Sequence, residues 1–341
     1  MDSTDGPLNS QNDGAPVGKP PSPTPADPVR SDLWYDDGNI ILQAENTRFK
    51  VYRGILVENS TVFRDMFSLP QPPGDADMVE GCPLVRLYDS AEEVGYVMEA
   101  LFRHRYLEPD EKMTFSVLEA LLCLGRKYDI RRLQVAARKR IFAEFPVSLE
   151  EYDALNCEWI GIDPPDIEWS IQLLAIARRA GLLSVLPAVF YAYCVSDDMF
   201  GLATSNPMRS VSPSDHNTCL RGHHIMCGVQ AETTFAWAYG AETRGDCSTY
   251  KRCEKTLNKY LITRFLPIAK DYGLESWSEA SAWLHGNLCA NCMKVAQEKH
   301  EAGRKQFWQR LPGLFNLPSW EELAKEREDM YVLSYLSHDI I

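Results

Sequence analysis

The sequence lacks the apolar segments that would place it in a membrane or direct it out of the cell. No apolar run approaches the length needed to cross a bilayer. The N-terminus has no basic segment followed by an apolar core, so we expect no secretory signal. Ten cysteines without such a signal indicate reduced thiols rather than a disulfide framework. We therefore expect a cytoplasmic or nuclear protein without a membrane partner.

The motifs of common enzyme classes are also missing. The chain has no Gly-x-Ser-x-Gly elbow, no glycine-rich phosphate loop ending in Gly-Lys-Ser/Thr and no His-Glu-x-x-His pair. Its seven histidines, including the adjacent His223 and His224, lie outside any catalytic motif. We expect a protein that is not an enzyme, and we assign no catalytic residue, no cofactor-binding residue and no cofactor. An enzyme with an unfamiliar site is the last alternative.

Positive charge is not in excess. The net charge of −13 argues against broad attraction to nucleic acid. One basic run has the composition of a phosphate-binding patch: Arg126, Lys127, Arg131, Arg132, Arg138, Lys139 and Arg140. Acidic residues interrupt this run, and the helices that carry it have apolar opposite faces. We therefore favour a solvated helix surface and expect no nucleic-acid partner.

Residues 1–30 contain no aromatic residue, but they hold seven prolines and three glycines. Such a segment cannot bury enough apolar surface to offset the entropy lost on ordering. We predict a disordered, proline-rich tail over residues 1–30.

The stretch from Asp32 to Phe67 predicts two short strands followed by two short helices. Residues 39–44 form a compact apolar run, and residues 49–52 alternate with the period of a half-buried strand. Turn-forming residues separate the two strands, which indicates a hairpin. Ser60 is a good N-cap for a helix with Val62, Phe63, Met66 and Phe67 on one side.

A third strand is expected at Leu84–Tyr88, followed by three helices, the first capped by Ser90. The apolar residues at helical spacing are Val94, Val97, Met98, Leu101 and Phe102 in the first, Phe115, Leu118, Leu121, Leu122 and Leu124 in the second, and Leu133, Ala137, Ile141 and Phe145 in the third. We expect one core to bury Phe49, Val51, Leu56, Phe63, Met66, Leu101 and Leu121 together.

This order of elements carries a resemblance. A hairpin ending in Phe-x-Val-x-Arg-x-x-Leu, followed by Ser-x-x-Phe-x-x-Met-Phe, resembles the opening of a BTB/POZ domain. Asp-Gly-Asn before the first strand and Phe-Ser-Leu-Pro-Gln-Pro after the second helix are similar to the expanded fungal BTB group. Tyr52 departs from the pattern, because many BTB domains have a structural histidine there. The resemblance implies an α+β BTB/POZ domain over residues 31–146, with a small sheet flanked by helices.

Residues 147–341 predict an all-α C-terminal domain, with no convincing strand from Ser148 onward. Its expected helices include a pair around Gly181, one beginning at Ser212 with Pro213 in its first turn, and further helices over 250–269, 276–300 and 320–333. This C-terminal half resembles the helical extension of the fungal BTB group, notably in Phe307-Trp308, Leu311-Pro312, Leu317-Pro318 and Trp320.

Cysteine and histidine are dense in this half. Three groups stand out: Cys219, His223 and Cys227; Cys247 and Cys253; and His285, Cys289 and Cys292. These are zinc ligand types, and Cys289-x-x-Cys292 has a ligand spacing. No second Cys-x-x-Cys pair accompanies it, and free cysteine is often simply buried. We favour buried structural thiols and assign no metal ligand. The alternative is a zinc site of Cys289 and Cys292 with partners from Cys219, Cys247 or Cys253.

The expected function is protein–protein interaction. The resemblance implies BTB-mediated homodimerisation, recruitment of protein partners and, as in many family members, docking onto a cullin scaffold for ubiquitin ligation. The sequence shows no MATH segment, kelch repeat or two-Cys, two-His finger. Their absence weakens two hypotheses about the function, that of a ubiquitin-ligase adaptor and that of a transcription factor. The alternative is a transcription or chromatin regulator that acts through BTB dimerisation, with a zinc-stabilised C-terminal domain.

Residues 54–67 have too many apolar side chains for one helix face: Ile55, Leu56, Val57, Val62, Phe63, Met66 and Phe67. We expect some of them to meet a second chain or the C-terminal domain.

Overall fold

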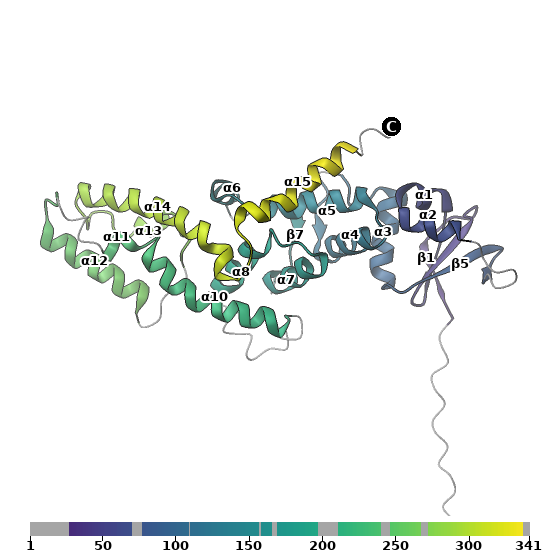
Figure 1. Ribbon diagram of the computed structural model, residues 1–341, viewed down its shortest axis with the longest axis horizontal. Coiled ribbons are helices and arrows are strands. Elements are labelled where there is room, and N and C mark those ends of the chain that lie inside the picture. The colour runs from purple at the N-terminus through teal and green to yellow at the C-terminus, as the bar shows by residue number, and fades with distance from the viewer. Residues whose placement is uncertain are drawn as a thin grey trace, which may run out of the picture.

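A computed structural model describes residues 27–69, 77–108, 110–156, 158–165, 169–196, 211–239, 246–266 and 272–336. The chain forms a small five-stranded sheet at one end, followed by helices, and is therefore mixed α+β (Figure 1). Most of the predicted tail, residues 1–26, lies outside the described residues. Among the described helices, none combines the length and the apolar character needed to span a bilayer.

The sheet has the strand order β1-β3-β2-β5-β4. Its strands are β1 (Val29–Trp34), β2 (Ile40–Ala44), β3 (Thr47–Val51), β4 (Met78–Val79) and β5 (Cys82–Leu87). The predicted hairpin is β2–β3, and the predicted third strand is β5, which pairs in parallel with β2. The sequence did not reveal β1 and β4. Both are edge strands, and only Leu33 of β1 is buried, so they lack a clear apolar alternation.

The predicted helices of this half occur in the expected order along the chain. They are α1 (Arg53–Asn59), α2 (Thr61–Ser68), α3 (Ala91–Arg103), α4 (Phe115–Lys127) and α5 (Arg131–Glu144). The side chain of Ser60 accepts a hydrogen bond from the Phe63 N–H, and that of Ser90 accepts one from the Glu93 N–H. These two N-caps confirm the predicted starts of α2 and α3.

Among the residues described after Ser148 there is a strand, which corrects the expectation of none. After α6 (Leu149–Ala154), β7 (Ile162–Asp163) pairs in parallel with β6 (Met113–Thr114). The buried carboxylate of Glu144 accepts hydrogen bonds from the N–H groups of Ile160, Gly161 and Ile162. A distant side chain thus aligns this loop, and such a contact leaves no local pattern in the sequence.

The remaining elements are helices. They are α7 (Trp169–Ala180), α8 (Leu186–Val195), α10 (Pro213–Glu232), α11 (Ala236–Tyr239), α12 (Tyr250–Phe265), α13 (Trp277–Ser281), α14 (Ala290–Leu314) and α15 (Trp320–Leu336). Gly181, at φ +74°, ends α7 as expected, and Ser212 caps α10 by accepting from the Asp215 N–H.

The predicted helix over 276–300 is wrong as a single element. Two helices occupy it, the short α13 and the long α14, with turns between them. Gly286, at φ +75°, lies in this interruption, and Cys289 is the N-cap of α14. The apolar residues continue across the gap because the connecting turns bury Leu284 and Leu288.

Two apolar cores hold the chain together. The first extends from Leu33 in β1 to Phe315 at the end of α14, so it crosses the predicted domain boundary at 146–147 without a break. It contains six of the seven residues of the predicted core, whereas Met66 is only partly buried and packs against it. The second core, between α11, α12, α13 and α14, forms the part of the molecule farthest from the sheet, which we call the distal lobe (Figure 1).

Helix α14 joins the distal lobe to the rest. Gly303 lies so close to the turn after α10 that a Cβ atom there would approach the Thr233 carbonyl oxygen to 2.2 Å. Next to it, the Arg304 guanidinium pairs with Asp153 of α6 and donates to the Leu274 carbonyl oxygen. Farther along α14, the Trp308 indole N–H donates to the Val147 carbonyl oxygen.

We predict that Phe63→Ala lowers the free energy of unfolding by about 3–5 kcal/mol. Phe63 is fully buried and stacks on Tyr128 with the ring centroids 4.8 Å apart, so the change leaves a cavity. Urea denaturation measures the effect. Tyr88→Ala is the control, because Tyr88 is 94% exposed and its loss should change stability by less than about 0.5 kcal/mol. Equal stability of the two variants would contradict this placement of Phe63.

A second prediction concerns acid stability. His300 is fully buried in the distal lobe, where it accepts from the Trp237 indole N–H and donates to the Glu275 carbonyl oxygen. Burial lowers the pKa of His300 to about 4. The unfolded chain takes up this proton near pH 6.5. Above about pH 6.5, His300 is neutral in both states and does not lower the free energy of unfolding. As the pH falls from 6.5 to about 4, the protonation of the unfolded chain lowers that free energy by roughly 3 kcal/mol.

Urea denaturation followed by tryptophan fluorescence, at several pH values, tests this dependence. His300→Gln keeps a polar side chain but cannot titrate, so its unfolding free energy should fall less steeply than that of the native chain between pH 6.5 and 4. Parallel curves for the two proteins would show that His300 does not carry the effect.

Candidate metal centre

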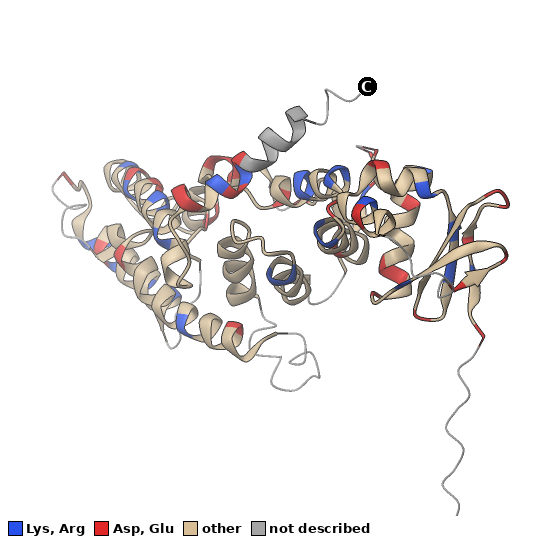
Figure 2. Ribbon diagram, turned by 45° about the vertical axis from the view of Figure 1, so that its right-hand side comes forward, with Lys and Arg blue, Asp and Glu red and all other residues tan. Residues whose placement is uncertain are grey.

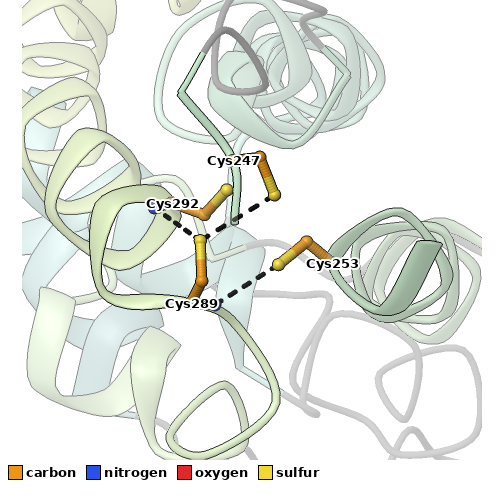
Figure 3. A group of neighbouring side chains, drawn as sticks. All are labelled: Cys247, Cys253, Cys289 and Cys292. Carbon is orange, nitrogen blue, oxygen red and sulfur yellow. Dashed lines mark hydrogen bonds between the residues drawn. The ribbon is translucent and has the colours of Figure 1, made fainter. Parts of the chain in front are cut away.

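Four cysteine side chains converge in the distal lobe: Cys247, Cys253, Cys289 and Cys292, called here the cysteine cluster (Figure 3). Cys247 lies in the loop before α12, and Cys253 lies in the first turn of that helix. Cys289 is the N-cap of α14, and Cys292 lies in its first turn. The cluster thus joins the beginnings of two helices that are distant in the sequence.

The thiols are close enough to share one ion. All four Sγ atoms lie within 4.8 Å of one another, and the Sγ atoms of Cys247 and Cys289 are 3.8 Å apart. No disulfide joins the nine cysteines that the structure describes. Three members of the cluster are buried, and only Cys247 is partly exposed.

Backbone N–H groups support the sulfur atoms. The N–H of Cys289 donates to the Cys253 Sγ at 3.3 Å, and the N–H of Cys292 donates to the Cys289 Sγ at 3.5 Å. The second contact is the capping bond of α14, with sulfur in the place of the usual capping oxygen. Donors and a helix N-terminus both favour the thiolate over the thiol.

The surroundings shift the pKa values of Cys289 and Cys292 in opposite directions. Burial raises the pKa of Cys289, but hydrogen bonds from the Cys292 and Ser248 N–H groups and side chains outweigh it and bring the pKa to about 6. Burial, together with hydrogen bonds to Cys247 and Cys289, raises the pKa of Cys292. Four adjacent thiols cannot all ionise without a cation between them, because like charges repel.

The structure separates the other predicted candidates from the cluster. Cys219 is buried in the first core, where its carbonyl oxygen accepts a hydrogen bond from the Cys194 thiol. Cys227 is partly exposed on α10. His285 approaches Ser281 rather than a cysteine, with 3.4 Å between its Nε2 and the Ser281 Oγ. Of the three partners considered for Cys289 and Cys292, the structure brings in Cys247 and Cys253 and leaves out Cys219.

A signal in the sequence could have singled out these two. Each precedes or begins a predicted helix, as Cys289 and Cys292 do once α14 is recognised to start at Ala290. Cys219, in contrast, lies in the second turn of a helix with a strong Ser-Pro start. The single helix expected over 276–300 concealed this parallel.

The basic run predicted on α4 and α5 is partly engaged within the fold. Arg126 donates to the carbonyl oxygens of Arg179 and Ala180, and Arg140 donates to those of Tyr106 and Glu108. Lys127 pairs with Asp89. Figure 2 shows Lys and Arg interspersed with Asp and Glu along the described helices. This distribution supports the interpretation of a mixed helix surface.

Apolar side chains remain at the surface of α1 and α2. Leu56 and Phe63 are fully buried, whereas Ile55 and Val57, on either side of Leu56, are partly exposed. Leu69, just after α2, is 65% exposed. In Figure 1, α1 and α2 lie near the sheet, at the end of the molecule opposite the distal lobe.

Comparison of the chain with known proteins gives no match among family models, curated proteins or solved structures.

Proposed function

We propose that this chain is a non-catalytic protein-interaction protein whose N-terminal unit self-associates in the manner of a BTB domain and recruits further protein partners. The order of elements is the observation that carries the proposal. A hairpin, two short helices, a strand parallel to the first, and then three helices follow one another between Ile40 and Glu144. This order agrees with the one that the sequence resemblance implies.

The face of α1 and α2 supports self-association. Ile55 and Val57 flank the buried Leu56, so they cannot both turn into the same core. Arg53 lies two residues before Ile55, and the exposed Arg64 donates a hydrogen bond to the Val57 carbonyl oxygen, so charged side chains border these apolar residues. A second copy of the chain presents the same patch, so two such faces can bury one another about a twofold axis.

The partners beyond a second copy follow from the resemblance. A cullin scaffold is the class of partner that the BTB resemblance implies, and it would make the chain an adaptor for ubiquitin ligation. The distal lobe, far from α1 and α2, would then be available to bind the protein that is recruited. Binding of a purified cullin N-terminal domain to the full chain tests this part separately from self-association.

We predict that Val57→Arg weakens self-association of the full chain at least about tenfold. A twofold interface contains the substituted residue twice, so the change places two positive charges in an apolar contact. Light scattering over a concentration series measures the effect, because the mass should fall toward that of one chain, 38.7 kDa. Tyr88→Arg adds the same charge at a 94% exposed position and should leave the mass unchanged.

Two results would contradict the proposed interface. A native chain that stays monomeric at every concentration forms no such dimer. A dimer that Val57→Arg and Tyr88→Arg leave equally strong uses another surface.

A further inference from the structure

We infer that the cysteine cluster binds one Zn²⁺ ion in a closed tetrathiolate site, and that this ion holds the distal lobe in its fold. The inference is independent of the proposed interaction through α1 and α2, because it depends only on residues at the other end of the molecule.

The positions of the sulfur atoms fit a single tetrahedral ion. Zinc–sulfur bonds of about 2.3 Å in a tetrahedron place the sulfur atoms about 3.8 Å from one another. The observed separation of the Cys247 and Cys289 Sγ atoms is 3.8 Å, and no pair in the cluster exceeds 4.8 Å. The remaining contraction is about 1 Å or less per pair, which a change of side-chain rotamer can supply.

Burial alone explains the cluster less well. A buried thiol is satisfied among apolar neighbours and needs no other sulfur nearby. Here the four sulfur atoms lie within 4.8 Å of one another, although two of the cysteines lie at the start of α12 and two at the start of α14. N–H donors aimed at the Sγ atoms of Cys253 and Cys289 also favour charged sulfur, which a buried cluster of neutral thiols does not require.

The ligand set selects the kind of ion. Four sulfur atoms and no carboxylate favour a soft or borderline ion over Mg²⁺ or Ca²⁺, and a tetrahedral all-sulfur set is typical of structural zinc. Four protein ligands also leave no open position for a substrate or an activated water. The site is therefore structural rather than catalytic.

The distal lobe has a reason to need such an ion. Among the described residues its core has eleven buried members, and three of these are the cysteines Cys253, Cys289 and Cys292. A core this small stabilises a fold poorly by apolar burial alone, and a structural metal is one of the usual remedies. Zinc would link the start of α12 to the start of α14, which continues to the Arg304–Asp153 pair at the base of the lobe.

The first test measures metal directly in the full chain. Elemental analysis of protein purified under reducing conditions should find one zinc per chain. Replacement of the metal with Co²⁺ should produce the intense near-ultraviolet thiolate-to-cobalt bands and the visible bands of a tetrahedral ion. A chain without stoichiometric zinc, which also gives no such bands on titration with Co²⁺, would overturn the inference.

The second test uses matched variants. Cys292→Ser should reduce the bound zinc from one per chain to nearly none after dialysis against a chelator of moderate strength. Cys227→Ser, which removes a cysteine of α10 outside the cluster, should keep one zinc per chain. Loss of zinc in both variants, or in neither, would contradict the assignment of the ligands.

The third test locates the structural effect, and it needs no substitution. Removal of zinc from the native chain with a strong chelator should speed hydrogen exchange in α12 and in the first turns of α14 by at least tenfold, while α4 stays protected. Addition of Zn²⁺ should restore the protection. Unchanged exchange in α12 after complete removal of zinc would show that the ion does not hold the lobe.

Discussion

Helix α4 packs against helices from both halves of the chain. From Val117 to Gly125 every residue of this helix except Glu119 is buried, and a helix that is apolar on nearly all sides must be surrounded by others. Helices α3, α5 and α7 provide that surrounding. At Gly125, helix α5 comes so close that an added Cβ would lie 3.1 Å from the Gln134 Cγ and 3.4 Å from the Gln134 backbone nitrogen.

Because α7 belongs to the helical half, α4 ties the two halves of the chain into one core. Charged residues reinforce this connection around Arg179, whose guanidinium pairs with Glu93 of α3 and Glu119 of α4. Helix α15 returns to the same region, where Arg327 donates to the carbonyl oxygens of Phe142 and Phe145. The unit that resembles a BTB domain is thus supported on its helical side by the rest of the chain, while α1 and α2 carry partly exposed apolar residues.

The distal lobe obeys a different constraint. It has its own small core and is linked to the first core through α10 and α14. A zinc ion at the start of α14 would stabilise the lobe locally. Farther along the same helix, the Arg304–Asp153 pair and the Trp308 hydrogen bond attach α14 to the rest of the molecule. Self-association at one end and a metal-supported lobe at the other are then compatible functions of one scaffold.

Local signals in the sequence were sufficient to predict several helices and their ends. Ser90 and Ser212 indicated the starts of helices, and Gly181 indicated the end of one. The spacing of residues such as Leu118 and Leu121 identified buried helix faces. These signals are local because caps and periodicity act within a few residues. Contacts between elements that are distant in the sequence could not be predicted in this way. The edge strand β1 depends on pairing with β3, and β7 depends on the distant Glu144 carboxylate. Likewise, the sequence offered three partners for Cys289 and Cys292, and only the folded path of the chain brought Cys247 and Cys253 beside them while burying Cys219 elsewhere. The positions of Cys247 and Cys253 near a helix start were a hint, but proximity in space depends on packing between elements that are distant in the sequence.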